Sequence, residues 1–401
     1  MMIVENYMFH VWNIFLILLQ LNKTSLMRSR EDFLLLLFIF FCLAGAIQFF
    51  YYFWFYLAHS FRKPLKYDEL SEPVSVIICA RNEAANLRKF LPQVLEQDYP
   101  SFEVIVVNDC SEDESDDVLG ELLVKFSNLR VSNINKDPRF THNKKFAQFI
   151  GIKAAANDIL IFTDADCYPV SREWIRKIAG NFTEGVEFVL GYGGYENRKG
   201  LLNKYIRYDT LFIGMQYTGM AIRGIPYMGV GRNLAYRKQV FFRNKGFGTH
   251  NHVVSGDDDL FVNENATKLN TRVELGPGSQ TMSLPAASVA DWVKQKQRHL
   301  STGNYYKIRD KALLLLEPGS RILFYSLLIV LLSYLYLWPV VVAIFTSRLV
   351  LQMFAFELSR RKFNERNILF LSLFFDIFSP VINLSLYFTS LKNRPASLVW
   401  K

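Results

Sequence analysis

The chain has 401 residues, enough for two or three domains, of which 51% are hydrophobic, 15% aromatic and 21% charged. This composition excludes a disordered tail and a fibrous protein, and so many aromatic residues are typical of proteins that face lipid. The net charge of +9 suits an anionic membrane surface, a phosphorylated substrate or nucleic acid. The four cysteines lie far apart without a Cys-x-x-Cys pair, so neither a disulfide framework nor a structural zinc site is expected.

The N-terminal region, residues 1–67, contains a long apolar segment. Residues 33–58 carry no charge and would extend about 39 Å as a helix, which is more than the thickness of the hydrocarbon core. Basic residues flank the segment, and aromatic residues gather at its far end, as in membrane-interface belts. We therefore predict a transmembrane anchor here rather than a signal peptide. The shorter apolar stretch at 9–21 is not counted as a span.

The C-terminal region, residues 311–401, contains two more apolar blocks, at 322–347 and 367–391. The first block includes Pro339 and suits either one long span or a hairpin of two short ones. We therefore expect two or three C-terminal spans. Basic residues flank nearly every end, so the positive-inside rule does not settle the parity of these spans.

Between the membrane regions, residues 68–310 have the mixed charge and the turn residues of a soluble domain. Short β-rich runs alternate there with segments of helical period. The predicted strands are 75–80, 102–109, 129–133 and 158–166. This alternation predicts an α/β fold with a mostly parallel sheet and helices on both faces, one of them at 144–156. Such sheets bind ligands beyond the carboxyl ends of their strands.

One segment of this domain is expected to contact the membrane. Residues 201–222 mix aromatic and aliphatic side chains. We interpret them as an amphipathic helix at the membrane interface, with a buried core helix as the alternative.

Aspartates follow two of the predicted strands. Asp109 ends the second strand, where a ligand contact and a helix cap are the alternatives. Asp164 and Asp166 follow the last strand in a Thr-Asp-Ala-Asp sequence. Two carboxylates at this spacing can hold Mg²⁺ or Mn²⁺ and leave coordination positions for a diphosphate, whereas a solvated turn is the simpler explanation.

Two further motifs lie later in the chain. In the run Ser255-Gly-Asp-Asp-Asp-Leu260, adjacent carboxylates repel one another, so one should have a raised pKa, as a general base requires. A helix N-terminus rich in Asp is the alternative. Gln295 and Arg298 lie on a predicted helix, where a solvated basic face is the usual explanation.

The order of these motifs resembles that of membrane-bound glycosyltransferases of family 2, relatives of the cellulose, hyaluronan and poly-N-acetylglucosamine synthases and of ceramide glucosyltransferase. The motifs are RNE at 81–83, VND at 107–109, Lys144, TDAD at 163–166, GDDDL at 256–260 and QKQRH at 295–299. Each is weak alone, but six in order with membrane segments on both sides are specific. The resemblance covers about residues 70–305 and the flanking spans, and it implies a GT-A-like, nucleotide-sugar-binding sheet.

The resemblance also implies which residues bind the nucleotide sugar. They are Asn82, Glu83, Asp109, Lys144, Asp164, Gln295, Arg298 and His299. By the same resemblance, Asp109 would hold the uridine, and Asp164 and Asp166 would meet the diphosphate and Mg²⁺ or Mn²⁺. The family has tryptophan where this chain has His299, which stacks less strongly and can titrate.

The resemblance implies one catalytic base in the acidic run. Register to Leu260 makes this base Asp257, with Gly256 where the family often has Glu. Asp258 is the alternative, if the register slips by one residue. One base without a protein nucleophile implies inversion at the anomeric carbon.

We therefore predict an inverting, metal-dependent transferase that moves a sugar from a nucleotide sugar, with a UDP-sugar as the expected donor, to a lipid-linked or glycan acceptor at the membrane. It would be an integral protein of the cell membrane with residues 68–310 in the cytosol, where nucleotide sugars are made. A processive polysaccharide synthase and a catalytically silent scaffold of the same fold are the alternatives. Nucleic acid is not an expected partner, because the basic residues are spread out.

Overall fold

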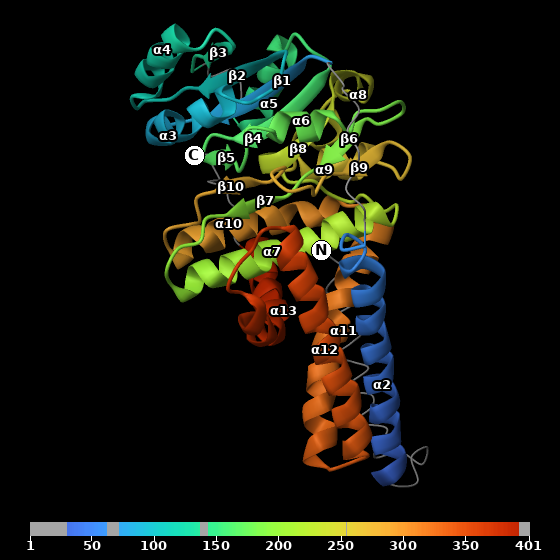
Figure 1. The fold of residues 1–401 in the computed structure, drawn as a ribbon. Coiled ribbons are helices and arrows are strands. Elements are labelled where there is room, and N and C mark those ends of the chain that lie inside the picture. The colour runs from blue at the N-terminus through green and yellow to red at the C-terminus, as the bar shows by residue number, and fades with distance from the viewer. Residues whose placement is uncertain (1–29, 62–71, 137–142, 254, 393–401) are drawn as a thin grey trace.

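The computed structural model describes residues 30–61, 72–136, 143–253 and 255–392. An α/β domain lies at one end of the molecule and a bundle of long helices at the other (Figure 1). The apolar stretch at 9–21 lies outside the described residues.

The α/β domain is built on a seven-stranded sheet of order β3-β2-β1-β4-β8-β6-β9. Its strands are β1 (Val74–Ala80), β2 (Phe102–Asp109), β3 (Leu129–Ile134), β4 (Ile159–Asp164), β6 (Phe188–Leu190), β8 (Leu234–Arg237) and β9 (Thr271–Val273). Strands β3, β2, β1 and β4 run parallel, and only β8 is antiparallel to its neighbours. The four predicted strands all form, and the prediction of a mostly parallel sheet is confirmed.

Four of the helices that pack against this sheet come from the first half of the domain. They are α3 (Ala84–Leu95), α4 (Ser115–Lys125), α5 (Lys144–Ala154) and α6 (Trp174–Ala179). Successive side chains of a strand point to opposite faces, so Ile77 of β1 joins the core that includes α5, whereas Val76 and Ile78 join the core of α3, α4 and α6. Both faces of the sheet are therefore covered.

A second, three-stranded sheet lies between the first sheet and the long helices (Figure 1). Its order is β5 (Cys167–Pro169), β10 (Thr281–Ser283) and β7 (Gly193–Tyr195). The domain also contains α7 (Leu201–Ile222), η2 (Gly231–Asn233), α8 (Lys238–Arg243), η3 (Gly248–His250), α9 (Asp259–Asn265), α10 (Val289–Thr302) and η4 (Gly303–Tyr305). Because β5 begins right after Asp166, that residue lies where the two sheets meet.

Helix α7 forms over the expected residues, but its surroundings differ from the prediction. Most of its side chains are buried, including Arg207 and Asp209. It lies between the α/β domain and the bundle (Figure 1), and at Gly219 an added side chain would collide with the backbone of Phe55. The prediction of an interface helix is therefore wrong and the alternative of a buried helix holds, because beyond its first turn every side chain of α7 is buried or half-buried.

Four helices are long and apolar enough to cross a membrane. They are Arg30–Tyr56, which joins α2 (Arg30–Phe50) to the π-helix η1 (Tyr51–Tyr56), then α11 (Ile308–Ser333), α12 (Trp338–Lys362) and Leu369–Ser390 of α13 (Leu369–Lys392). The first corresponds to the predicted anchor. The block 322–347 is a hairpin of two long helices rather than two short ones, because Leu335 and Leu337 turn the chain with positive φ and Pro339 starts α12.

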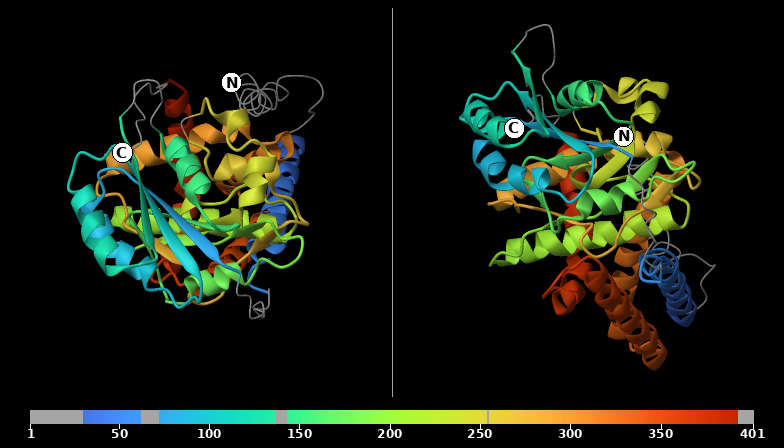
Figure 2. Two further views of the ribbon diagram at one scale, coloured as in Figure 1. Left: turned by 90° about the horizontal axis from the view of Figure 1, so that it is seen from above. Right: turned by 45° about the horizontal axis from the view of Figure 1, so that its top comes forward.

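Helix α13 is placed differently from the other three. In Figure 1, α2, α11 and α12 extend side by side away from the α/β domain, whereas α13 stays beneath α7 and α10; Figure 2 gives two further views. The far end of α13 is attached to the domain, since Gln297 donates to the Thr389 hydroxyl at 2.9 Å and Tyr387 donates to Asn304 at 2.7 Å. Three helices therefore form the extended bundle, and the fourth stays close to the domain.

The bundle contains a buried ionic network. Asp376 accepts from Arg321 and Arg348, each at 2.8 Å, and Arg321 also pairs with Glu317 at 3.0 Å. Arg348 donates further to Gln48 of α2 at 2.9 Å. Charged groups in membrane helices usually face the interior and pair in this way, so the network joins α2, α11, α12 and α13 from within.

Candidate active site

The carboxyl ends of three parallel strands bring the predicted site residues together. On β1, Cys79 is paired with Asp164 of β4, and Ala80 is paired with Asn108 of β2. The loops that leave these strands therefore begin side by side at one edge of the sheet, the usual location of ligand sites in such folds.

The loop after β1 is tied to the loop after β2. Asn82, with a φ of 55°, accepts from the Glu112 backbone N–H at 2.8 Å and donates its own N–H to Ser111 at 2.9 Å. Burial, together with the charges of Asp166 and Asp164, raises the pKa of Glu83 to about 7. Glu83 is thus close enough to Asp164 and Asp166 to interact with their charges. Asp109 lies at the end of β2 and is completely buried.

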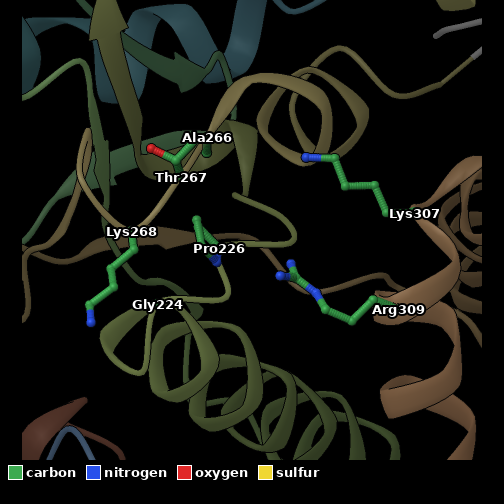
Figure 3. A pocket seen from close by; sticks show the side chains of 7 residues that line it. All are labelled: Gly224, Pro226, Ala266, Thr267, Lys268, Lys307 and Arg309. Atoms are coloured by element: carbon green, nitrogen blue, oxygen red, sulfur yellow. The ribbon is translucent and has the colours of Figure 1, made fainter.

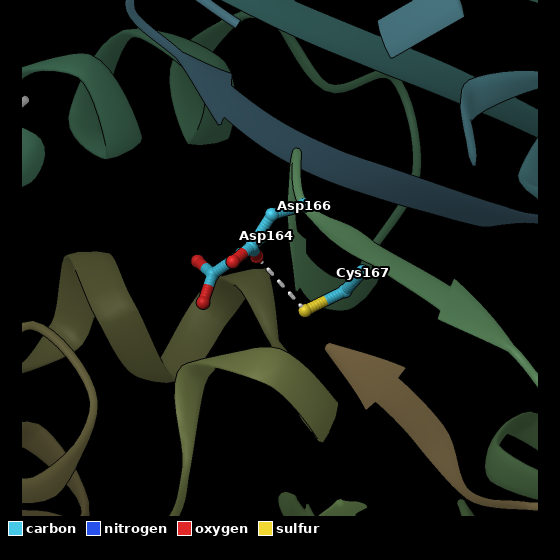
Figure 4. A group of neighbouring side chains, drawn as sticks. All are labelled: Asp164, Asp166 and Cys167. Atoms are coloured by element: carbon cyan, nitrogen blue, oxygen red, sulfur yellow. Dashed lines mark hydrogen bonds between the residues drawn. The ribbon is translucent and has the colours of Figure 1, made fainter. Parts of the chain in front are cut away.

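The aspartates after β4 form the candidate metal site. Carboxylate oxygens of Asp164 and Asp166 and the Sγ atom of Cys167 lie within 4.8 Å of one another (Figure 4). Asp166 accepts from Ser283 at 3.0 Å and from the Cys167 thiol at 3.2 Å. Burial and the charge of Asp164 raise the pKa of Asp166.

These residues fit a hard divalent cation. The two carboxylates are only partly buried, and a cation between them would relieve the repulsion that raises the pKa of Asp166. Burial raises the pKa of the Cys167 thiol, which keeps the sulfur protonated and makes it a poor ligand. The oxygen pair is therefore the part of this group suited to Mg²⁺ or Mn²⁺.

Lys144 links this pair to the acidic run. Its Nζ atom lies 2.8 Å from an Asp164 oxygen and 3.4 Å from an Asp257 oxygen. Burial opposes the ionisation of Asp164, but the nearby Lys144 charge prevails and lowers its pKa. Lys145 points the other way and donates to the carbonyls of His250 and Val253 at 2.7 and 2.9 Å, which holds the segment before the run.

The three adjacent aspartates have three different surroundings. Asp257 is 5% exposed and lies next to Lys144. Asp258 caps α9, and accepts from the N–H groups of Gly231 at 2.6 Å and Asp259 at 2.8 Å. Burial and the two neighbouring aspartates raise the pKa of Asp258 to about 7. Asp259 is buried and accepts from Thr302 and Tyr306.

Helix α10 contributes the later motif. Gln295 donates to the Tyr195 hydroxyl at 3.0 Å, and the buried Lys296 pairs with Asp209 of α7 at 2.6 Å. The charge of Arg298 reaches Asp164 and contributes to its lowered pKa. Partial loss of water around His299 and the charge of Arg298 lower the pKa of its ring, which favours the neutral form.

Arg232 also belongs to this site, although none of the six motifs includes it. Its guanidinium lies 4.3 Å from the centre of the Tyr195 ring and donates to the Gly193 carbonyl at 2.9 Å. Its charge acts on both Asp164 and Asp166. The signal in the sequence was a cation between a glycine and an asparagine, in Gly231-Arg-Asn233. In the folded chain the Gly231 N–H donates to Asp258.

A mostly parallel sheet with these acidic loops at the carboxyl ends of its strands is the GT-A architecture of glycosyltransferases. Residues 75–242 match the sequence model of glycosyl transferase family 2, and residues 159–388 match that of glycosyl transferase family group 2. The second match covers more than half of the chain, and the chain therefore belongs to the family 2 glycosyltransferases. The predicted family and fold class are confirmed.

Two curated relatives are 25% and 30% identical to this chain, and each is longer than the region that matches. The probable glycosyltransferase YdaM of Bacillus subtilis is 25% identical over 260 residues, which cover 63% of this chain and 60% of the relative. Glycosyltransferase AglE of Haloferax volcanii is 30% identical over 199 residues, 46% of this chain and 58% of the relative. The chain thus spans about three fifths of the length of these relatives.

Among solved structures, the chain is similar to the mannosyltransferase PcManGT from Pyrobaculum calidifontis in complex with GDP-Man and Mn²⁺. The TM-score is 0.55, with 17% sequence identity over 86% of this chain and 99% of that one. A similarity at this level of identity concerns the fold.

Proposed function

We propose that this protein transfers a sugar from a nucleotide sugar to a membrane-associated acceptor, with divalent metal and with inversion at the anomeric carbon. The observation that carries the proposal is the position of Lys144, within 3.4 Å of both Asp164 of the strand-end pair and Asp257 of the acidic run. The donor diphosphate and the acidic run that supplies the base would thereby lie next to each other. A catalytically silent scaffold of this fold would not require Lys144, Asp164 and Asp257 to lie together.

The donor would lie across the carboxyl ends of β1, β2 and β4. The loop containing Asn82 and Glu83, with Asp109 beside it, would face the nucleoside. We assign a UDP-sugar as the expected donor by family resemblance. A GDP-sugar is the second choice, because the structurally similar mannosyltransferase contains GDP-Man.

Asp164 and Asp166 would hold Mg²⁺ or Mn²⁺. When bound, such an ion neutralises charge that develops on the departing diphosphate. Lys144, Arg232 and Arg298 would add fixed positive charge beside the diphosphate, since each of them lowers the pKa of Asp164. Cations already in place stabilise a developing anion without reorganising.

The acceptor hydroxyl needs a base, and the acidic run offers two candidates. The position relative to Leu260 favours Asp257 as the base, but Asp257 is buried and Lys144 compensates its charge. Asp258 is more open, and with a pKa of about 7 it can take up a proton at neutral pH. The base in this proposal is therefore Asp258, with Asp257 as the alternative.

Inversion follows from the roles assigned. A retaining double displacement needs a protein nucleophile at the anomeric carbon, and no group has that role here. Direct attack by the deprotonated acceptor from the face opposite the diphosphate breaks one bond and forms one bond, so an α-linked donor gives a β-linked product.

The placement in the cell is part of the proposal. Residues 1–67 and 311–401 would anchor the protein in the cell membrane, and residues 68–310 would lie in the cytosol with the nucleotide sugars. The four apolar helices support membrane association. The acceptor, lipid-linked or glycan, would approach from the side of the domain that faces the bundle.

The test uses membranes containing the full chain, incubated with UDP- and GDP-sugars while release of nucleoside diphosphate is measured with Mn²⁺ or EDTA. Asp166→Ala should abolish release and weaken donor binding. Asp98→Ala is the matched control, because it removes an exposed carboxylate from the loop that enters β2 at its amino end, whereas the site lies at the carboxyl ends. Undiminished turnover of the wild type in EDTA would contradict the metal assignment, and no release from any donor would contradict the activity.

A further inference from the structure

A pocket of about 340 Å³ opens on the opposite end of α9 from the acidic run (Figure 3). It lies where α7 and α9 end and α11 begins. Three of its seven lining residues are cationic, namely Lys268, Lys307 and Arg309, and none is acidic. Small or compact residues such as Gly224 and Pro226 form much of the remaining wall, which leaves room for a ligand.

The pocket carries an excess of positive charge. Arg309 is paired with Asp310 at 2.8 Å, but neither Lys268 nor Lys307 forms an ion pair with any described carboxylate. The Lys307 Nζ atom donates to the Glu264 carbonyl oxygen at 3.3 Å. In Figure 3 the head groups of Lys307 and Arg309 point toward the same opening. An anion in this opening would meet Lys307, which has no carboxylate partner among the described residues, and Arg309, whose charge is shared with Asp310.

The pocket lies at the level where two candidate spans begin or end. Arg223, directly after α7, lies 4.3 Å over the Trp54 ring and donates to the Trp54 carbonyl at 2.8 Å. Trp54 belongs to the aromatic end of the first candidate span, and tryptophan there is typical of the membrane–water interface. The pocket wall includes Arg309 at the start of α11, and beside it Ile308 is 80% exposed.

We propose that this pocket binds the phosphate group of an anionic membrane lipid. Lysines without a carboxylate partner attract anionic headgroups near a membrane surface, and the pocket lies at the first turn of the long helix α11, the positive end of its dipole. Exposed Ile308 and Trp54 suit the neighbouring acyl region. The inference requires insertion in the membrane but not sugar transfer, so it stands apart from the proposed activity.

The test measures the thermal midpoint of the purified full chain in detergent during titration with phosphatidylglycerol, phosphatidylcholine or inorganic phosphate. The key variant is Lys268→Ala with Lys307→Ala. The control is Lys125→Ala with Lys153→Ala, which removes the same charge from exposed positions on α4 and α5. Lys268→Arg with Lys307→Arg keeps the charge and should respond like the wild type.

Phosphatidylglycerol should raise the midpoint of the wild type and of the control, and phosphatidylcholine should have little effect. Each lysine near an anionic surface is worth about a fivefold change in lipid affinity, so the key variant should need about thirtyfold more phosphatidylglycerol. Equal responses of the key variant and the control would overturn the proposal. An equal stabilisation by inorganic phosphate would assign the pocket to a soluble anion and contradict the lipid.

Discussion

Two regions of this molecule bury charged side chains, and they balance them differently. In the bundle, two cations and two anions pair with one another, since Asp376 meets both Arg321 and Arg348 and Arg321 also meets Glu317. In the cleft, Lys144 lies between Asp164 and Asp257, while Asp166 and Asp258 have raised pKa values. Buried charges that are fully paired hold helices together, whereas an acidic excess leaves capacity for a cation or a proton.

Breaking the balance in the bundle should have the largest effect. Arg348→Met leaves Asp376 with one of its two cations and should destabilise the protein by about 3–5 kcal/mol, because one buried charge is then incompletely compensated. Thermal unfolding in detergent measures this. Arg361→Met, in the same helix but exposed beside Glu357, should change stability by less than about 1 kcal/mol. Equal midpoints for the two variants would remove the distinction between the regions.

Removing the base should slow chemistry without harming the fold. Asp258→Asn should lower turnover by about 10²–10⁴-fold, or about 3–5 kcal/mol in barrier, with donor affinity kept. Asp257→Asn should instead keep most of the turnover and tighten donor binding, since it removes a negative charge beside Lys144 and leaves that lysine freer to meet the diphosphate. Single-turnover rates and binding of a UDP-sugar analogue separate these effects. If the two phenotypes are exchanged, Asp257 is the base and the register from Leu260 is right.

The stability of the cleft should depend on pH in a defined direction. The fold raises the pKa of Asp258 to about 7, so ionised Asp258 destabilises the folded state. This penalty is absent below pH ~4, grows up to pH ~7 and is complete above it. Asp258→Asn should therefore raise the thermal midpoint at pH 8 and have little effect at pH 4. A shift of the same size at both values would argue against the raised pKa.

The smallest effect is expected from a change that keeps charge. Arg232→Lys preserves the cation but loses the stacking on Tyr195 and the fixed geometry at Gly193. We expect about a tenfold or smaller rise in KM for the donor, measured by initial rates, with Arg172→Lys as the exposed control. An unchanged KM would remove Arg232 from the donor site.

The sheet and most of the site could be predicted because their signals are local. Runs such as Val104 to Val107 identify a buried strand by themselves, and the residue after a strand end identifies a ligand edge. Helix α7 was misread because a helix buried between two layers has the same composition as one on a membrane surface. Asp258 and Arg232 depend on contacts with Gly231 and Tyr195 that only the folded chain brings together.

Helix α13 has a mechanical consequence. Its Asp376 is fixed to the arginines of the bundle, and its Thr389 is hydrogen-bonded to Gln297 of α10, the helix that carries Arg298 and His299. Helix α13 is thus attached at two places, to the bundle through Asp376 and to α10 through Thr389. If the bundle crosses the bilayer as proposed, a change in bilayer thickness that tilts the bundle would shift α10, and the physical state of the lipid would then affect the proposed donor site.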